Sequence, residues 1–408
     1  MANRIVGLYK EAYAGVPGGA WLLAAADFIN RTGFMVLVFL NIYLTRHLQF
    51  SLAQAGRVLA GYGIGAIAGG YLGGYLSDRL GPRSVMISSL VAGGGLLIFT
   101  AYASSYPAML ALIFLYGLIA TALFPANDTA MSRYCGGEMR AKGFALRRLA
   151  SNLGITIGPV IGGFLILIDY KWIFWVDGLT SLAAAAVIAL WLKIPSAQGS
   201  GIAPGLHNKA SLGAIPSPEV SRRSPWRDST FLGFLGLFLI VATVFAQIFS
   251  TFPLYLNGRY GLKESQIGPL WAVNTLMIVV IEMVLLHNLR KKRAMDLIAL
   301  GAVLIGLGFA LLPLGRTFLF AAFTVAVWTM GEILTMPLTA TVVSNRAGGA
   351  SAGRYLGLLS LAFSLSMLIA PLAGNMLLAS AGGTALWLIA GASSALAGAG
   401  FWLLRKKM

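Results

Sequence analysis

Long apolar runs, separated by short polar turns, recur along the whole chain. Each run is about as long as the roughly 20 residues that an α-helix needs to cross a bilayer. Lipid offers no hydrogen bonds to an open backbone, and the runs lack the alternation of barrel strands, so the pattern predicts membrane-spanning helices. Twelve are predicted, at about residues 19–45, 53–76, 83–104, 107–130, 146–168, 172–193, 231–256, 266–287, 294–315, 317–340, 355–378 and 383–404.

One long polar segment, 195–229, lies between the sixth and seventh predicted spans and is rich in Ser, Gly, Pro and Arg. Its composition predicts a linker between two six-helix bundles, residues 1–194 and 230–408. The halves share residues at a constant offset of 212 positions, which indicates a duplicated unit with the substrate site expected where the halves meet. The matching pairs are Tyr43 with Tyr255, Gln54 with Gln266, Gly56 with Gly268, Pro125 with Pro337, Pro159 with Pro371, and Gly162 with Gly374.

The charged residues support a membrane protein and predict its orientation. Only 11% of residues are charged, against about 25% in soluble domains. With a cytoplasmic N-terminus, 23 of the 30 Lys and Arg residues fall on the cytoplasmic side, six fall on the outer side, and Arg31 lies within a span. This bias predicts that both termini and the linker are cytoplasmic. It also accounts for the net charge of +17 without a nucleic-acid partner.

No metal site or disulfide is expected. Cys135 is the only cysteine, and the three histidines are far apart in the sequence. Residues 1–17 show no cleavable signal peptide, and the loops are compact, which favours a bacterial inner membrane.

Two glycine-rich motifs stand out. The first follows the second span and comprises Gly74, Asp78, Arg79, Gly81 and Arg83. The second lies in the fifth span and comprises Gly154, Gly158, Pro159, Gly162 and Gly163. Together with twelve spans in two halves, they resemble the loop signature of the major facilitator superfamily and the fifth-span signature of its drug:proton antiporter branch. The resemblance implies an all-α fold of two pseudo-symmetric six-helix bundles.

Each motif also has a physical interpretation. The glycines permit close helix–helix approach, and Pro159 removes a backbone hydrogen bond and bends its helix. The resemblance implies that the first motif latches the two halves on the cytoplasmic side while the cavity faces outward. Asp128 in the fourth span is the expected partner of Arg79 or Arg83. The alternative is that these charges only face lipid headgroups and that the glycines only serve packing.

Ionisable residues inside spans are costly and mark functional candidates. We expect Glu332, Glu282 and Asp27 to couple transport to protons, because a carboxyl group in a low-dielectric cavity can load and release a proton near neutral pH. Asp27 and Arg31 are four residues apart, so they share a helix face and are expected to pair. The alternative is that this pair is structural and that the glutamates bond to hydroxyls of neighbouring helices.

Substrate contacts are predicted for Arg31, Asn30, Gln247 and Trp328, although packing would also explain a buried aromatic residue. Asp177 is expected to be interfacial and structural, because it lies near the outer end of the sixth span.

These features predict a proton-coupled secondary transporter that moves a small organic solute across the inner membrane by alternating access, with efflux by antiport favoured. One alternative is a proton-coupled importer of a metabolite or peptide, since Asp27-x-x-Asn30-Arg31 is similar to the Glu-x-x-Glu-Arg of peptide transporters. Another is a membrane enzyme or receptor, but the sequence has no His/Asp cluster and no nucleotide loop. We expect a monomer with no cofactor, powered by the proton gradient, whose partners are the bilayer, the solute and protons.

Overall fold

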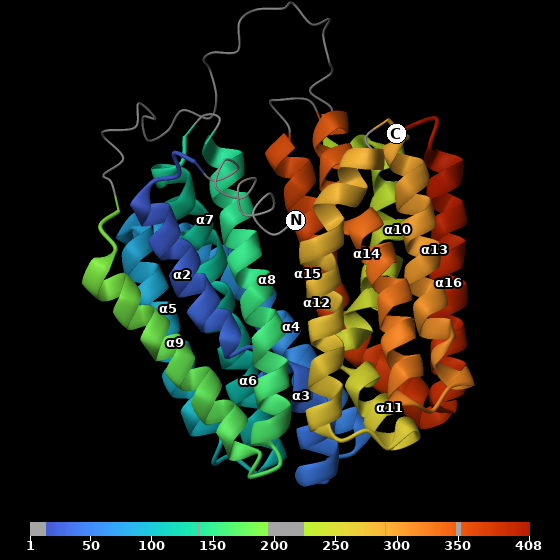
Figure 1. Cartoon of the computed structure of the whole chain (residues 1–408), viewed down its shortest axis with the longest axis horizontal. Coiled ribbons are helices and arrows are strands. Elements are labelled where there is room, and N and C mark those ends of the chain that lie inside the picture. The colour runs from blue at the N-terminus through green and yellow to red at the C-terminus, as the bar shows by residue number, and fades with distance from the viewer. Residues whose placement is uncertain (1–13, 137–138, 195–223, 290, 348–351) are drawn as a thin grey trace, which may run out of the picture. The chain divides into compact units, whose positions relative to one another are not determined.

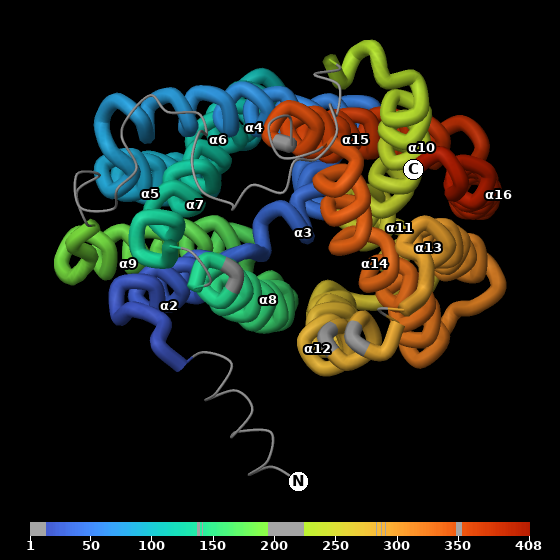
Figure 2. The backbone as a smooth tube through the Cα atoms, turned by 90° about the horizontal axis from the view of Figure 1, so that it is seen from above, coloured from blue at the N-terminus to red at the C-terminus, as the bar shows by residue number. Residues whose placement is uncertain are grey.

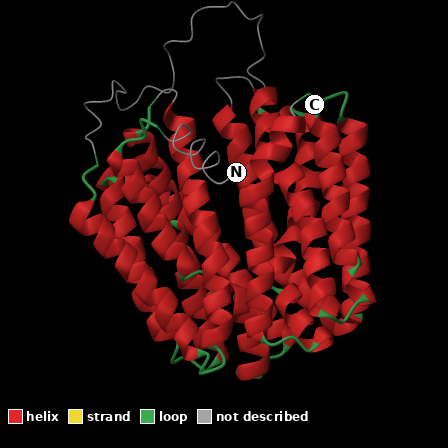
Figure 3. Cartoon of the chain, viewed as in Figure 1, coloured by secondary structure: helices red, strands yellow, loops and turns green. Residues whose placement is uncertain are grey.

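The computed structural model of the chain describes residues 14–136, 139–194, 224–289, 291–347 and 352–408. Most of the predicted linker lies outside this description, at 195–223, as does Arg290. The described residues are helical, with no strand among them (Figure 3). The all-α prediction is therefore confirmed for the part of the chain that is described.

A helix or a pair of helices occupies each of the twelve predicted spans (Figure 1). Three spans are each built from two helices, namely α2 (Gly18–Thr32) with α3 (Val36–Ile42), α6 (Tyr106–Thr121) with α7 (Leu123–Tyr134), and α10 (Ser229–Phe245) with α11 (Thr251–Tyr260). The others are α4 (Leu52–Leu80), α5 (Pro82–Thr100), α8 (Met139–Leu165), α9 (Lys171–Trp191), α12 (Glu264–Leu289), α13 (Ala294–Ala310), α14 (Phe318–Ala347), α15 (Ala352–Ser380) and α16 (Gly382–Leu404).

Ten of these segments are long and apolar enough to cross a bilayer by length and composition alone. The helices α4 and α8 are not among the ten, although both are longer than 20 residues. Glycines and polar residues lower their apolar character: the last turn of α4 contains Ser77, Asp78 and Arg79, and α8 has four basic residues within its first ten positions. These are the two helices that contain the glycine-rich motifs.

The contacts divide the chain into two compact units. Unit 1 comprises Met1–Tyr43, Gly61–Pro204 and Lys263–Thr275. Unit 2 comprises Leu44–Ala60, Gly205–Leu262 and Leu276–Met408. Each unit thus contains one short segment from the other half of the sequence, which is the first part of α4 or of α12.

In unit 1, α2 packs against α8 and α9, and α5 packs against α9, α6 and α7 (Figure 2). The core between α2, α5, α7 and α9 is apolar and includes the buried side chains of Leu23, Met86, Leu90, Met131 and Ile188. In water, burial of a large aliphatic side chain of this kind stabilises a fold by about 1.5–3 kcal/mol. In lipid the surroundings are as apolar as the core, so dense packing of the side chains holds the helices together.

In unit 2, α13 lies between α14 and α16 (Figure 2). Glycines make this possible, because a Cβ at Gly301 or Gly308 would overlap α14 and one at Gly306 would overlap α16. The centre of the unit is aromatic. The ring of Phe309 stacks on Trp328 and on Trp387, with centroids 5.8 and 5.3 Å apart.

The sequence repeat reappears as a pair of equivalent contacts. Within unit 2, a Cβ at Gly56 would lie 2.9 Å from the carbonyl oxygen of Pro371. Within unit 1, a Cβ at Gly268 would overlap the carbonyl oxygen of Pro159. Gly268 and Pro159 are the partners of Gly56 and Pro371 at the offset of 212. The shared residues therefore mark equivalent helix crossings, where the absence of a side chain lets a backbone carbonyl approach.

A second equivalent contact lies where spans are interrupted. In unit 1, Gly162 packs against the side chain of Met35, just after α2 ends. In unit 2, Gly374 packs against the side chain of Gln247, just after α10 ends. Positions 35 and 247 also differ by 212. The first and seventh spans are thus interrupted at equivalent points, each against a glycine of a neighbouring helix.

Candidate functional site

The interruption of the first span brings together polar residues of unit 1. The α2 helix ends at Thr32, and α3 starts at Val36. No side chain fits at Gly33, because a Cβ there would overlap Thr180 and Asp177 of α9. A helix break exposes backbone N–H groups that need acceptors, and the Val36 N–H lies 3.5 Å from a carboxylate oxygen of Asp177.

Asp177 is therefore buried within unit 1. Its residue is only 4% exposed, and it contacts the start of α3 from a different helix. The turn between α2 and α3 covers the side chain, and the predicted interfacial position of Asp177 stays a prediction. A signal was present in the sequence: Asp177 and Ser181 are four residues apart, so they form a polar stripe on one face of an apolar helix.

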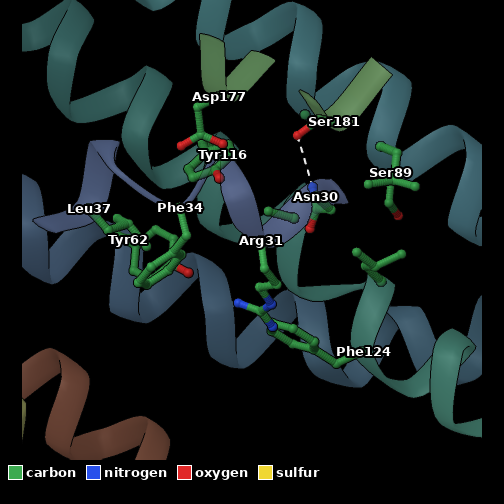
Figure 4. A pocket seen from close by; sticks show the side chains of 14 residues that line it. Asn30, Arg31, Phe34, Leu37, Tyr62, Ser89, Tyr116, Phe124, Asp177 and Ser181 are labelled. Atoms are coloured by element: carbon green, nitrogen blue, oxygen red, sulfur yellow. Dashed lines mark hydrogen bonds between the residues drawn. The ribbon is translucent and has the colours of Figure 1, made fainter. Parts of the chain in front are cut away.

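A narrow cavity of about 50 Å³ lies beside this break (Figure 4). It is large enough for a few water molecules or one small functional group, not for a whole organic solute. The Asn30 amide donates a hydrogen bond of 3.0 Å to the Ser181 hydroxyl. The other polar or aromatic residues of its wall come from six helices and the break itself, and they are Arg31, Phe34, Tyr62, Ser89, Tyr116, Phe124 and Asp177.

Arg31 lies in this wall with its guanidinium against aromatic rings. Its Cζ is 4.9 Å from the centroid of Phe124 and 5.8 Å from that of Phe34. Figure 4 shows the side chain turned toward Phe124 and away from Asp177. Its Nε is buried without a hydrogen-bond partner in the described part of the chain. Cation–π contacts stabilise a guanidinium, but they leave its N–H donors available to an anionic group.

The expected Asp27–Arg31 pair does not form among the described residues. Asp27 is buried and instead accepts a short hydrogen bond from the Ser151 hydroxyl of α8. The reason is the close packing of α8, since a Cβ at Gly154 would lie 2.5 Å from the Cβ of Arg31. Asp27 is thus directed to α8 and Arg31 to α7, although the two share one stretch of helix.

A second cavity, of about 10 Å³, adjoins Asp27, Asn30 and Asn127. The Oδ1 atom of Asn127 is buried there without a hydrogen-bond partner in the described residues. Asn30 lines both cavities. Polar groups therefore continue along α2 from Asp27 to the break.

The fifth-span motif packs directly on this part of α2. Gly154 contacts the backbone of Phe28 and Arg31, and a Cβ at Gly158 would lie 3.0 Å from the Thr32 carbonyl oxygen. Gly163 packs against the backbone of Glu264 in the same unit. The close approach that these glycines predict is present, together with Pro159 inside α8. The role of the motif in antiport stays a prediction.

The first motif has different partners from those predicted. Asp128 of α7 pairs with Arg147 of α8, with nitrogen and oxygen 2.6 Å apart. Arg83 instead donates a hydrogen bond of 2.6 Å to the carbonyl oxygen of Ala189, near the end of α9. The Cζ of Arg79 lies 4.5 Å from the centroid of the Tyr75 ring. The pairing of Asp128 with Arg79 or Arg83 is therefore wrong for this structure, because Asp128 faces α8.

The turn itself has the backbone that its glycines predict. Gly81 has a φ of 81° and precedes Pro82, the first residue of α5. A left-handed residue before a helix favours glycine. Gly74 lies near Pro125, and Asp78 is exposed. A latch function for these residues stays a prediction.

The predicted residues of unit 2 are placed differently. Gln247 is buried, donates to the Ala370 carbonyl oxygen and accepts from the Ser250 and Thr251 hydroxyls. Its carboxamide is therefore used within the protein, which contradicts a direct substrate contact. Trp328 is 2% exposed inside the aromatic cluster, so packing explains it.

The two glutamates of unit 2 are partly buried, Glu282 on α12 and Glu332 on α14. Both make interactions with other residues. Their assignment as proton carriers stays a prediction.

The repeat also shows where the two units differ chemically. At the offset of 212, Arg31 corresponds to Thr243 and Asp177 corresponds to Ile389. The packing is repeated, but the two charged residues beside the break are not. Within the described residues, no group of three or more His, Cys, Asp or Glu side chains is placed to hold a metal ion. The break in unit 1 is accordingly the strongest candidate site.

Comparisons with known proteins agree with this architecture. A family model described as Major Facilitator Superfamily matches residues 21–371. An uncharacterised MFS-type transporter, YttB of Bacillus subtilis, is 26% identical over 89% of each chain. A Na⁺, Li⁺, K⁺/H⁺ antiporter of Planococcus maritimus is 24% identical over 86% of this chain and 87% of its own.

A solved structure of a POT family transporter in complex with 5-aminolevulinic acid has a TM-score of 0.81 at 15% identity, with 97% of each chain covered. At this identity the likeness concerns the fold alone. It supports the predicted major facilitator fold. The family match covers most of the sequence, and its members are transporters, not enzymes. The chain is therefore a multi-pass membrane protein that belongs to the Major Facilitator Superfamily.

Proposed function

We propose that this protein is a proton-coupled secondary transporter of the inner membrane that exports a small organic solute by antiport and alternating access. The observation that supports a solute site in unit 1 is the Arg31 guanidinium. It lines a polar cavity at a helix break, it has no carboxylate partner among the described residues, and its Nε is unsatisfied. Arg31 is partly buried, and a charge withdrawn from water without a partner is costly, so a ligand that supplies the counter-charge has a physical reason to bind there.

The substrate class follows from the same geometry. A guanidinium recognises carboxylate oxygens through paired N–H donors. The cavity of about 50 Å³ has room for such a group, while the rest of the solute lies outside it. The rings of Phe34 and Phe124 contact the guanidinium and hold it in place. We therefore propose a solute with a carboxylate.

We propose that Glu332, Glu282 and Asp27 couple transport to protons, and that Asp177 takes part as a fourth carboxyl group. Asp27 has a hydroxyl donor in Ser151, and Asp177 faces the break beside Arg31. Solute binding and carboxyl protonation would both change the charge beside Arg31, so the two events are coupled by electrostatics. The proton gradient supplies the energy, with no cofactor.

A second candidate is exchange of monovalent cations for protons. The relative from Planococcus maritimus, whose name describes this activity, favours it. It requires carboxylates to bind the cation and gives Arg31 no direct ligand role. Import with protons, the third candidate, uses the same residues and differs in the direction of proton movement.

The test uses the purified full chain in liposomes with an internal pH dye. Carboxylic acids, amino acids, peptides and neutral drugs are added one at a time, then Na⁺, Li⁺ and K⁺ salts. We expect proton movement opposite to a carboxylate-bearing solute. Arg31→Gln should lower this flux about tenfold or more, as expected for loss of a charge-assisted hydrogen bond.

Two variants separate the candidates. Arg227→Gln removes an exposed charge before α10 and should leave the flux unchanged. Glu332→Gln should abolish concentrative transport but allow solute exchange. Cation-driven proton flux that Arg31→Gln does not alter would favour cation exchange. Co-movement of solute and protons would establish the importer.

A further inference from the structure

Unit 2 contains a larger cavity that none of the groups above uses. It has a volume of about 480 Å³ and lies at the end of the unit where α11 finishes and α16 begins. Its polar lining includes Arg46 from the π-helix after α3, and Arg259 and Tyr255 from α11. Leu52, Leu254 and Leu378 form apolar parts of the wall. The volume is typical of a small-ligand site.

The Tyr255 hydroxyl is an unused hydrogen-bonding group in this wall. The residue is only 6% exposed. Its oxygen is buried and has no hydrogen-bond partner among the described residues. Arg259 and Arg316 act on it electrostatically, but Arg259 does not reach hydrogen-bond geometry. A buried hydroxyl normally has a partner, so this donor is available to a group inside the cavity.

The two arginines of the wall also lack counter-charges. In the described part of the chain, no acidic side chain pairs with the Arg46 or the Arg259 guanidinium. The two side chains come from different segments, and a Cβ at Gly258, the neighbour of Arg259, would lie 3.2 Å from an Arg46 guanidinium nitrogen. Both arginines line the same cavity, and two like charges at one cavity repel each other unless an anion lies between them.

The sequence offers no acid to neutralise this end of unit 2. Segments 44–60, 245–262, 311–320 and 376–388 contain no Asp or Glu, but they contain Arg46, Arg57, Arg259 and Arg316. The opposite end of the same unit differs, because Asp228 pairs with Arg346 and Asp296 with Arg405. The positive charge beside the cavity is therefore a local property, not a feature of the unit as a whole.

We infer that this cavity binds a phosphate group, held by Arg46, Arg259 and the Tyr255 hydroxyl. A tetrahedral oxyanion has several acceptor oxygens and can accept hydrogen bonds from two guanidinium groups and a hydroxyl at once. The phosphate can belong to a phospholipid headgroup, with its chains against the apolar wall, or to a free phosphate-bearing solute. Both sources require the same three donors.

The experiment measures thermal unfolding of the purified full chain in two arms. In detergent without added lipid, inorganic phosphate is titrated against chloride at equal ionic strength. In phosphate-free buffer, the protein is placed in nanodiscs of phosphatidylglycerol or of a galactolipid that has no phosphate. Binding to the folded state raises the midpoint with ligand concentration. Stabilisation in the first arm identifies a free anion, and stabilisation in the second identifies a lipid headgroup.

The variants decide whether the response belongs to this cavity. Arg46→Gln and Arg259→Gln should each weaken phosphate binding by about tenfold, as loss of a charge-assisted hydrogen bond predicts. Lys263→Gln, an exposed cation that does not line the cavity, should respond like the wild type. An equal response of the wild type and both arginine variants in the two arms would overturn the inference, as would no response of the wild type in either arm.

Tyr255→Phe provides a test that does not remove a charge. Its hydroxyl has no partner in the described residues, so the variant should unfold at the wild-type temperature or above it without phosphate. With phosphate, its affinity should fall several-fold. A lower unfolding temperature without phosphate, or unchanged phosphate affinity, would show that the hydroxyl does not serve the anion.

Discussion

Replacement of Asp228 tests how unit 2 is held together at its other end. Asp228 precedes α10 and accepts a hydrogen bond from the Phe231 N–H at 3.1 Å, so it caps the helix. Its two carboxylate oxygens each lie 2.7 Å from an Arg346 nitrogen of α14. The Tyr355 hydroxyl of α15 donates to it at 3.1 Å. Arg346 also donates to the Lys407 carbonyl oxygen beyond α16. The Asp228 carboxylate and its partner Arg346 together connect four helices.

The size of the effect follows from burial. The side chains of Asp228 and Arg346 are 12% and 20% exposed, so removal of the charge leaves a mostly buried guanidinium unpaired. We expect Asp228→Asn to lower the free energy of unfolding by about 3 kcal/mol, near the lower limit for breaking a buried pair. Asn is as good a helix cap as Asp, so Asp228→Ala should cost about 1 kcal/mol more.

Denaturant unfolding of the purified protein, followed by tryptophan fluorescence, measures these differences. Asp296→Asn is the matched control, because the Asp296–Arg405 pair is longer, at 3.4 Å, and more exposed. It should change stability by no more than about 1 kcal/mol. Equal stability of Asp228→Asn and the wild type would refute the four-helix connection. Equal stability of the Asn and Ala variants would refute the cap.

Stability should also depend on pH through this group. The hydrogen bonds from Arg346 hold the pKa of the Asp228 carboxyl below its usual range. A carboxyl with a lowered folded-state pKa stabilises the fold above its unfolded value of about 3.9, and this stabilisation is lost as pH falls through the folded value. Acid should therefore destabilise the wild type more than Asp228→Asn. A parallel decline of both proteins below pH 4 would contradict this assignment.

Four other variants test further parts of the structure. Gly154→Ala should lower the free energy of unfolding by about 1–3 kcal/mol through overpacking. Gly158→Ala should lower it less, because its Cβ would approach α2 at 3.0 Å instead of 2.5 Å. The reverse order of the two unfolding midpoints would refute this packing. Gln247→Leu should lower the unfolding midpoint, because it leaves the Ala370 carbonyl and two hydroxyls without their partner. The relative transport rates of different solutes should stay unchanged. An altered preference among solutes would show that Gln247 contacts the substrate after all. Asp78→Asn should slow transport in liposomes without altering stability, as a latch predicts, and wild-type flux would exclude that role.

The sequence was sufficient for features that depend on one helix or on the repeat. A span needs only a run of apolar residues, so all twelve spans correspond to helices. The offset of 212 also anticipated geometry, because Gly56 and Gly268 face equivalent proline carbonyls. In both cases the physical requirement is local: enough apolar length in the first, and a missing side chain in the second.

The partners of charged groups were not predictable in this way. Asp27 and Arg31 lie four apart, yet their orientation is decided by α8, which supplies Ser151 to one and packs Gly154 against the other. Asp128 likewise has Arg147 within reach because of how α7 and α8 pack. Helical spacing shows which residues can meet, whereas the neighbouring helix determines which of them do.

The comparison of the two helix breaks gives the strongest argument for where function lies. Both breaks pack against a glycine of a neighbouring helix, so the duplicated unit provides the interruption itself. In unit 2 the polar groups at the break satisfy one another through Gln247. In unit 1 the break contains Arg31 and Asp177, which have no charged counterparts at the offset of 212, and the Arg31 Nε is unsatisfied among the described residues. Packing requires the interruption in both units, but it requires no charge in either. Asp177 accepts the Val36 N–H at the break, so it is the Arg31 charge that calls for another explanation, and the proposed carboxylate of the solute provides one.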